Sequence, residues 1–214
     1  MDAVESKKYS YMNIGTGILL AAITVYGWLN LPDQIAIHFN AAGAADGFAD
    51  KTSGLLIIPL LFAGLNILFK SIPWIDPLGE NIEEFQDTYE KLVIAVLGFM
   101  VYIQALIVFW NLEASFTVTQ ALVPAIAGLY YFMGDVISSA KRNWFVGIRT
   151  PWTLSSEEVW DKTHERCGPL FKIAALITLP ALILPDYFIV LTVAPVLAVS
   201  LYAVLYSYRE YQKQ

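Results

Sequence analysis

The apolar residues of the chain gather in six blocks that alternate with polar and charged segments. The blocks cover residues 12–29, 53–69, 92–110, 119–137, 168–184 and 187–206. A helix needs about 20 predominantly apolar residues to cross about 30 Å of hydrocarbon, and each block comes close to that length. The pattern predicts six membrane-spanning helices, with the last two joined by a tight turn at Pro185 and Asp186.

Composition supports a membrane protein. Of the 214 residues, 57% are hydrophobic and 15% are charged, whereas soluble domains carry about 25% charged residues. We therefore expect one polytopic, all-α membrane domain over residues 1–214. The single cysteine, Cys167, excludes an intramolecular disulfide. The net charge of −6 argues against direct nucleic-acid binding through a basic patch.

The distribution of Lys and Arg predicts the orientation, because short cytoplasmic loops carry an excess of cations. With the N-terminus in the cytoplasm, twelve of the 13 cations fall on the cytoplasmic side and only Lys51 on the outer side. The twelve are Lys7, Lys8, Lys70, Lys91, Lys141, Arg142, Arg149, Lys162, Arg166, Lys172, Arg209 and Lys213. We expect both termini in the cytoplasm, and outer segments at residues 30–52, near Glu113 and at residues 185–186.

The outer segment of residues 31–51 alternates in polarity. Apolar residues at positions 35, 37 and 39 alternate with Ala36, His38 and Asn40, which is the period of a strand. An Asp-Gly pair at positions 46–47 indicates a turn. The pattern predicts a small outer hairpin or cap between the first and second spans. Two interpretations stay open: His38 and Asn40 hold the loop by local hydrogen bonds, or they bind an outside ligand together with Asp46.

The cytoplasmic segment of residues 138–169 is too long to be a simple connector, and we expect it to be ordered. Its first half interleaves cations with aromatic residues, which suits the lipid headgroup layer. In the second half, Ser155 and Glu158 form a capping-box pattern that starts a helix. Gly168 and Pro169 are expected to break that helix before the fifth span.

A functional interpretation of the same segment gathers its polar and aromatic residues into one inner site. The residue before Pro151 is pushed towards an extended conformation, so the chain turns sharply and the next helix returns over the loop. An arginine there would stack on indole or bind an anion. Asp161, His164 and Cys167 offer only three metal donors, so no metal is expected. On the helix after the cap, Trp160, Thr163, His164 and Cys167 fall at helical spacing on one side. The candidate inner residues are Arg149, Thr150, Trp152, Trp160, Thr163 and His164.

Two acidic features accompany these loops. Asp135 is the only acid inside the predicted spans, and its place near the end of the fourth span indicates that it reaches the interface and pairs there. An acidic run at residues 83–90 is either a solvated helix face or a segment that docks near Arg142 and Arg149.

Both long loops resemble the signatures of the SdpI-type immunity family. LPDQIAIHFNAAGAADGFADK is similar to the N-terminal signature, and NWFVGIRTPWTLSSEEVWDKTH to the second; together with the spans they extend over residues 11–70 and 119–206. The matching residues are His38, Phe39, Asn40, Gly43, Asp46, Gly47, Lys51, Asn143, Trp144, Gly147, Arg149, Thr150, Pro151, Trp152, Thr153, Trp160, Thr163 and His164. The chain departs from the family in having Gly134-Asp135 where many members have Gly-Asn.

The resemblance implies a six-span plasma-membrane protein that protects its producer from a secreted killing peptide and draws a transcriptional repressor to the membrane. The expected partners are the lipid bilayer, a peptide toxin on the outer face and a cytoplasmic repressor on the inner face, with no cofactor. The outer candidate residues are then His38, Asn40, Asp46 and Lys51. Two alternatives stay open, because function belongs to sites and not to folds: an integral membrane enzyme or transporter acting on a lipid or peptide, and a purely regulatory receptor.

Overall fold

The computed structural model describes residues 3–112 and 115–214, so the predicted outer link near Glu113 lies outside the described residues. Six long helices are joined by one hairpin and four short helices. The elements are α1 (Ala3–Asn30), β1 (Gln34–Phe39), β2 (Ala45–Asp50), α2 (Lys51–Ile75), α3 (Gly79–Glu83), α4 (Gln86–Asn111), α5 (Val118–Ser139), α6 (Pro151–Ser155), α7 (Glu157–Thr178), the 3-10 helices η1 (Leu179–Leu182) and η2 (Pro185–Tyr187), and α8 (Phe188–Tyr211).

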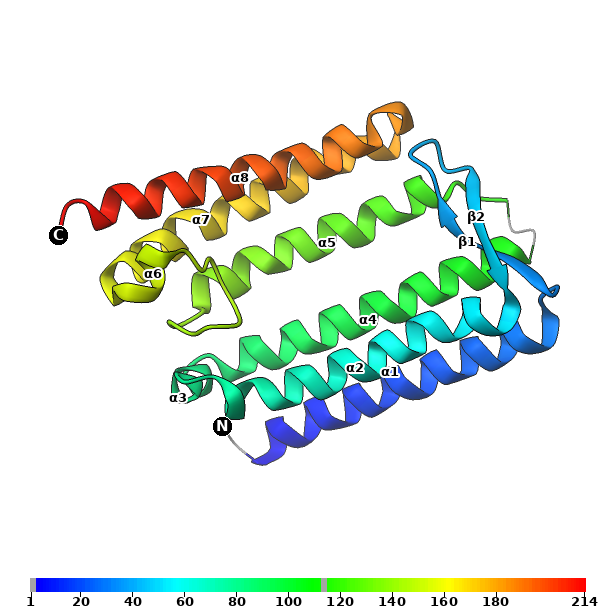
Figure 1. Cartoon of the computed structure of the whole chain (residues 1–214), viewed down its shortest axis with the longest axis horizontal. Helices are drawn as coiled ribbons and strands as arrows, with labels where there is room; N and C mark the ends of the chain where they lie inside the picture. The colour runs from blue at the N-terminus through cyan, green and yellow to red at the C-terminus, as the bar shows by residue number, and fades with distance from the viewer. Residues whose placement is uncertain (1–2, 113–114) are drawn as a thin grey trace.

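The long helices form two groups that lie side by side. Helices α1, α2 and α4 pack together in one group and α5, α7 and α8 in the other, and the groups meet where α4 contacts α5 (Figure 1). The β1–β2 hairpin and η1 lie at one end of the bundle, which we call the hairpin end. Helices α3 and α6, the start of α1 and the end of α8 lie at the opposite end, which we call the α6 end (Figure 1).

Among the described residues, five helices are long and apolar enough to cross a membrane: Lys8–Asn30, Lys51–Ile75, Gln86–Asn111, Val118–Ser139 and Pro185–Tyr211. An all-α membrane protein is therefore confirmed in outline. The predicted fifth span, residues 168–184, falls on the second half of α7 and on η1. It is not among the five because the first half of α7 is rich in charged residues.

Helix α7 is continuous, so the predicted break at Gly168 and Pro169 is wrong. The reason is tertiary packing against α5. A Cβ atom on Gly134 would lie 2.7 Å from the Gly168 carbonyl oxygen, and one on Gly168 would lie 2.8 Å from the Gly134 carbonyl oxygen. Two glycines thus let the helix backbones approach closely, as small residues do between membrane helices. This contact holds the helix through Pro169.

The predicted start of this helix is also displaced by one residue. Ser155 ends α6, and the N-cap of α7 is Ser156, whose Oγ accepts a hydrogen bond from the Val159 N–H at 3.4 Å. The capping box of this region lies instead at Thr150 and Thr153, at the start of α6. A short helix that the sequence pattern did not predict therefore occupies the place of the expected cap.

Polar side chains join the helices within each group. Gln104 on α4 is fully buried, and its Nε2 donates to Thr24 Oγ1 on α1 and to the Leu55 carbonyl oxygen on α2, each at 3.1 Å. Asp135 on α5 forms an ion pair with Lys172 on α7 at 2.5 Å. The prediction that Asp135 finds a partner is thus confirmed, and Asp135 neutralises Lys172, the cation that weakens the predicted fifth span.

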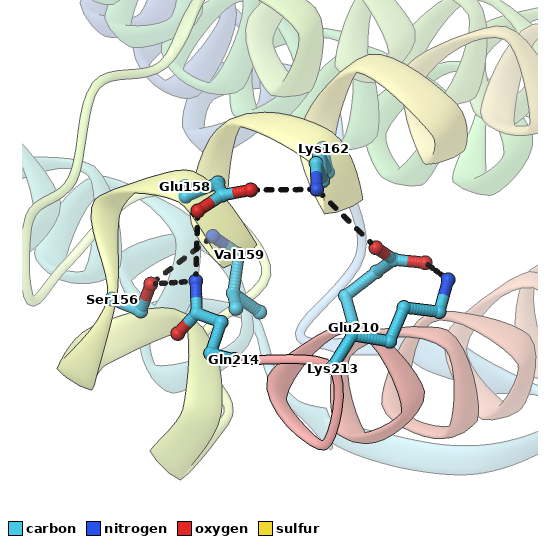
Figure 2. Close-up of polar contacts among 7 residues, drawn as sticks. All are labelled: Ser156, Glu158, Val159, Lys162, Glu210, Lys213 and Gln214. Carbon is cyan, nitrogen blue, oxygen red and sulfur yellow. Dashed lines mark hydrogen bonds and ion pairs between the residues drawn. The ribbon is translucent and has the colours of Figure 1, made fainter.

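The end of α8 is fastened to the start of α7 at the α6 end (Figure 2). Gln214 Nε2 donates to Ser156 Oγ at 2.9 Å and to Glu158 Oε2 at 3.2 Å, and Lys162 Nζ lies 3.6 Å from Glu210 Oε2. These contacts fix the C-terminal helix beside α6 and α7, on which most of the candidate inner residues lie.

Candidate functional site

The predicted hairpin is confirmed, but the turn expected at Asp46 and Gly47 is wrong: both residues lie in β2, and the chain turns at residues 40–44. Strands β1 and β2 pair antiparallel, with His38 opposite Gly47, and the register is irregular on both sides of His38. A Cβ atom on Gly47 would lie 2.8 Å from the His38 Cβ, so glycine gives the histidine room at this point. The hairpin leads directly into α2, because Asp50 caps that helix by accepting a hydrogen bond from the Ser53 N–H at 3.0 Å.

His38 and Asp46 form an exposed pair on the hairpin. His38 Nδ1 lies 2.6 Å from Asp46 Oδ1, and the two side chains are 71% and 44% exposed. Because the carboxylate accepts at Nδ1, the other ring nitrogen, Nε2, remains able to hydrogen-bond a ligand. Two of the predicted outer residues are thus brought together in an accessible position.

Asn40 and Lys51 have local partners. Asn40 Oδ1 accepts hydrogen bonds from the Ala42 and Ala44 N–H groups at 3.0 and 3.1 Å, around a turn in which Gly43 has φ +78°. Lys51 Nζ donates to the Leu31 carbonyl oxygen at 2.9 Å and lies 3.7 Å from Asp33. The turn and the base of the hairpin are held by these two side chains, as the interpretation by local hydrogen bonding expects.

Asn111 anchors the hairpin to the bundle, and sequence reasoning missed it. Its Oδ1 accepts from the Ala36 N–H at 2.8 Å, and its Nδ2 donates to the Ala36 carbonyl oxygen at 2.9 Å. These two hydrogen bonds imitate those that a neighbouring strand would form with β1. A second contact joins Phe39 and Trp110 edge to face, with ring centroids 4.9 Å apart. The only signal in the sequence is an amide residue at the end of an apolar block.

A cleft of about 230 Å³ lies beneath β1 and the hairpin turn, between α4, α5 and α8. Its roof carries polar side chains and its other walls are mostly apolar. The lining includes His38 and Asn40 in the roof and Ile103, Leu106, Leu122 and Phe188 in the walls. The volume is below the roughly 300–1,000 Å³ of typical small-molecule sites, so the cleft suits one inserted side chain better than a whole ligand.

At the α6 end, the segment between α5 and α6 is ordered around buried Asn143. Its Oδ1 accepts from the Phe145 and Val146 N–H groups at 2.8 and 2.6 Å, and its Nδ2 donates to the Lys141 and Val146 carbonyl oxygens. Asp76, buried at the end of α2, accepts from the Trp144 N–H at 2.8 Å. The polar groups of this segment thus hold its own backbone.

The connection between α2 and α4 docks on this segment through residues that precede the acidic run of residues 83–90. Asn81 Nδ2 donates to the Arg142 carbonyl oxygen at 2.7 Å, whereas no ion pair joins residues 83–90 to Arg142 or Arg149 within the described residues. Asp76 supplies the second link between the two cytoplasmic segments of the prediction. The contacts between the two segments thus come from Asp76 and Asn81, and within the described residues the acids of residues 83–90 do not supply them.

Trp160 and His164 form a buried stack on α7. Their ring centroids are 3.9 Å apart, and Trp160 Nε1 donates to the Ala140 carbonyl oxygen at 2.7 Å. His164 Nε2 accepts from the Ile148 N–H at 2.9 Å, so Nδ1 carries the proton and donates to the Trp160 carbonyl oxygen at 2.8 Å. Burial lowers the pKa of His164 from 6.5 to about 4. The ring is therefore neutral near pH 7 and serves as a backbone partner.

Gly147 is required where the loop crosses this stack. Its φ is +123°, and a Cβ atom there would lie 2.5 Å from His164 Nε2 and 2.9 Å from Trp160 Cη2. Thr163 is also fully buried, and its hydroxyl has no hydrogen-bond partner among the described residues. The face of α7 that sequence spacing predicts is thus confirmed as a packed face.

The remaining inner candidates point elsewhere. Arg149 is exposed and its Nη1 donates to the Trp144 carbonyl oxygen at 2.8 Å, instead of stacking on indole. Thr150 Oγ1 donates to Ser207 Oγ on α8 at 3.1 Å, and the Trp152 ring packs on Tyr208 with centroids 5.0 Å apart. The structure therefore does not gather the inner candidates around one cavity, and the outer candidates lie at the opposite end of the bundle.

Two family models match separate parts of the chain. The SdpI/YfhL protein family matches residues 139–207, which hold the ordered segment, α6, α7 and most of α8. A domain of unknown function, DUF1648, matches residues 16–63, which hold the hairpin.

Similarity to a curated protein extends across both parts. The chain is 23% identical over 207 residues to the immunity protein SdpI of Bacillus subtilis (strain 168), which covers 91% of this chain and 90% of that protein. No solved structure matches the chain. The resemblance of the chain to the SdpI-type family is thereby confirmed.

Proposed function

We propose that this protein is a plasma-membrane immunity protein that protects the cell producing it from a secreted peptide toxin. The observation that carries the proposal is the similarity to an immunity protein over nine-tenths of both chains, through the hairpin as well as the inner segment. The function is then a property of the whole membrane domain and not of one loop.

The orientation that fits this role places the hairpin end outside the cell and both termini in the cytoplasm. Among the 13 cations, Lys51 begins α2 at the hairpin end, while Lys70, Lys91 and Lys141 belong to the α6 end. Helix α7 then makes the sixth crossing, because it connects α5, which ends at the α6 end, with α8, which begins at the hairpin end. Its Lys172 is paired with Asp135.

Cysteine labelling tests the orientation. Ala42→Cys and Ser155→Cys place one exposed thiol at each end, and the native Cys167 is buried and gives little background. In intact cells, a membrane-impermeant maleimide is expected to label the variant at position 42 and to label the variant at position 155 only after permeabilisation. Labelling of the Ser155 variant in intact cells would overturn the proposed orientation.

The toxin contact that we propose is the cleft beneath the hairpin. Its apolar walls would take one side chain of an amphipathic peptide, and the His38–Asp46 pair and the Asn40 turn above it would meet neighbouring polar groups. Protection would follow from holding the peptide at the membrane surface, before it assembles in the bilayer.

Expression in a sensitive bacterium tests the proposed function. Cells that carry the gene are expected to survive a concentration of the cognate peptide that kills cells with an empty vector, and to bind labelled peptide at their surface. Equal killing of both strains, with inserted protein of normal abundance, would contradict the proposal.

A second role, recruitment of a cytoplasmic regulator, is proposed for the segment of residues 140–150. The observation that favours it is that Lys141, Trp144 and Arg149 are exposed on a backbone that Asn143 and Asp76 hold rigid. Co-purification of a cytoplasmic protein with the wild type, but not with Trp144→Ala, would support the role. A regulator that is retained equally by both would contradict it.

A further inference from the structure

A larger cavity, of about 490 Å³, lies at the α6 end among α1, α2, α3 and α4. It is separate from the hairpin cleft and from the α6 segment, and none of the candidate residues lines it. Its volume falls within the roughly 300–1,000 Å³ that small-molecule sites occupy.

The cavity lies at the depth of lipid headgroups, whichever way the protein is oriented. Three candidate spans have an end beside it: Lys8–Asn30 begins there, Lys51–Ile75 ends there and Gln86–Asn111 begins there. Residues within a turn or two of a span's end sit at the boundary between headgroups and hydrocarbon, where tryptophan is enriched. Trp74, which lines the cavity, is 89% exposed.

The lining changes in polarity with depth. Ser10 and Gln86 lie near the start of their candidate spans and Glu83 ends α3, whereas Ile14, Val93 and Ile94 lie one to two turns further into the spans. A polar rim above an apolar floor is the profile of an amphiphile whose head stays at the interface.

A specific contact fixes the wall formed by α2. Pro73 has no N–H, so the Phe69 carbonyl oxygen four residues earlier loses its helical partner. The Tyr89 hydroxyl on α4 donates to that oxygen at 2.6 Å. Tyr89 therefore holds the wall that α2 forms, and the cavity lies beside Pro73 in the last turns of that helix.

Three charged side chains line the cavity: Lys70, Glu83 and Glu90. Opposite charges that share a cavity would be expected to pair, yet none of the three forms an ion pair within residues 3–112 and 115–214. Glu90 accepts a hydrogen bond from Gln86 Nε2 at 3.1 Å. A ligand with one anionic and one cationic group would satisfy both signs.

We propose that this cavity binds a phospholipid with a primary ammonium in its headgroup, of the phosphatidylethanolamine class. The phosphate lies on the Lys70 ammonium, which reaches outward from its place in α2. The headgroup ammonium lies between the Glu83 and Glu90 carboxylates and donates hydrogen bonds to them, and one acyl chain lies along Ile14, Val93 and Ile94. A lipid with a quaternary ammonium has no N–H to donate to the carboxylates, and a lipid with an anionic headgroup is repelled by them. Lipids of these two classes are therefore bound less well than the ethanolamine lipid.

Native mass spectrometry of the full-length protein, released from nanodiscs, tests the proposal. The nanodiscs contain equal amounts of phosphatidylethanolamine, phosphatidylglycerol and phosphatidylcholine. The wild type is expected to retain mainly the ethanolamine lipid, and Glu83→Gln with Glu90→Gln to retain the three lipids equally. Lys70→Gln is expected to lower the retention of every phospholipid.

The matched controls change the same charges outside the cavity. Glu84→Gln is adjacent to Glu83, and Lys141→Gln lies at the same end; neither residue lines the cavity, and both variants are expected to behave as the wild type. Melting temperatures show that each variant is folded. Equal retention of the three lipids by the wild type, or an equal loss in Glu84→Gln, would overturn the proposal. So would displacement of the lipid by glycerophosphoethanolamine, which would indicate a site for the free headgroup.

Discussion

The hairpin end and the α6 end use the same residue types in opposite ways. At the hairpin end, a histidine is 71% exposed on a carboxylate partner, above a small apolar cleft. At the α6 end, His164 is 2% exposed, and both of its ring nitrogens are hydrogen-bonded to backbone groups. A histidine in a signature sequence is therefore no guide to chemistry until its surroundings are known. The exposed ring at the hairpin end is accessible from outside the protein, whereas the buried ring at the α6 end holds the local backbone.

A substitution at Gly147 is the most severe test of the buried packing at the α6 end. Gly147→Ala combines a backbone at φ +123° with a Cβ atom 2.5 Å from His164 Nε2. Backbone strain and overpacking together are expected to lower the free energy of unfolding by about 2–5 kcal/mol. The measurement is thermal unfolding in detergent. Gly128→Ala on α5, which meets no atom within 4 Å, is the control and should unfold as the wild type does. Equal losses in both would contradict the described packing.

The protonation of His164 makes the free energy of unfolding depend on pH. The folded-state pKa is about 4 and the unfolded value is 6.5, so between these values the unfolded chain binds more protons. Stability is therefore fully present above pH 6.5 and is expected to fall as the pH drops towards 4, by up to about 1.4 kcal/mol per pH unit. Melting curves at pH 7.5, 6 and 5 measure this fall. His164→Gln, which lacks the titrating ring, should show a shallower slope; an unchanged slope would assign the effect to another group.

Asn111 tests how the hairpin end is attached. Asn111→Ala leaves the buried N–H and C=O of Ala36 without their partner, at a cost of about 1–3 kcal/mol for each group left unsatisfied. The hairpin is expected to detach while the helices remain folded. Hydrogen exchange should accelerate in residues 34–50 and stay slow in α5 and α7. Acceleration throughout the chain would show that Asn111 supports the whole bundle.

His38 should have the smallest effect on stability and a large one on protection. His38→Ala removes one exposed pair, so the free energy of unfolding is expected to change by less than about 0.5 kcal/mol. If the cleft receives the toxin as proposed, protection is nevertheless lost. Gln34→Ala, on the same strand but outside the cleft, should protect as the wild type does. Parallel loss of abundance and protection in His38→Ala would instead indicate a structural role.

Local patterns predicted the elements of both ends but not the contacts that join them. The alternation around Ile35 predicted a hairpin, and the spacing of Trp160, Thr163 and His164 predicted a common face; both are present. Asn111 and Asp76 were missed because their partners are 75 and 68 residues away, and nothing in a local window marks such a contact. The expected break at Gly168 failed for the same reason, since Gly134 on another helix decides it.

The ion pair between Asp135 and Lys172 also constrains how the chain is made. Each charge alone adds about 2.5–3.5 kcal/mol to the cost of inserting its helix, and each is neutralised only by the other helix. If α7 crosses the bilayer as proposed, the pair would favour entry of α5 and α7 together over entry of either helix alone, so these two helices would pack during insertion and not after it.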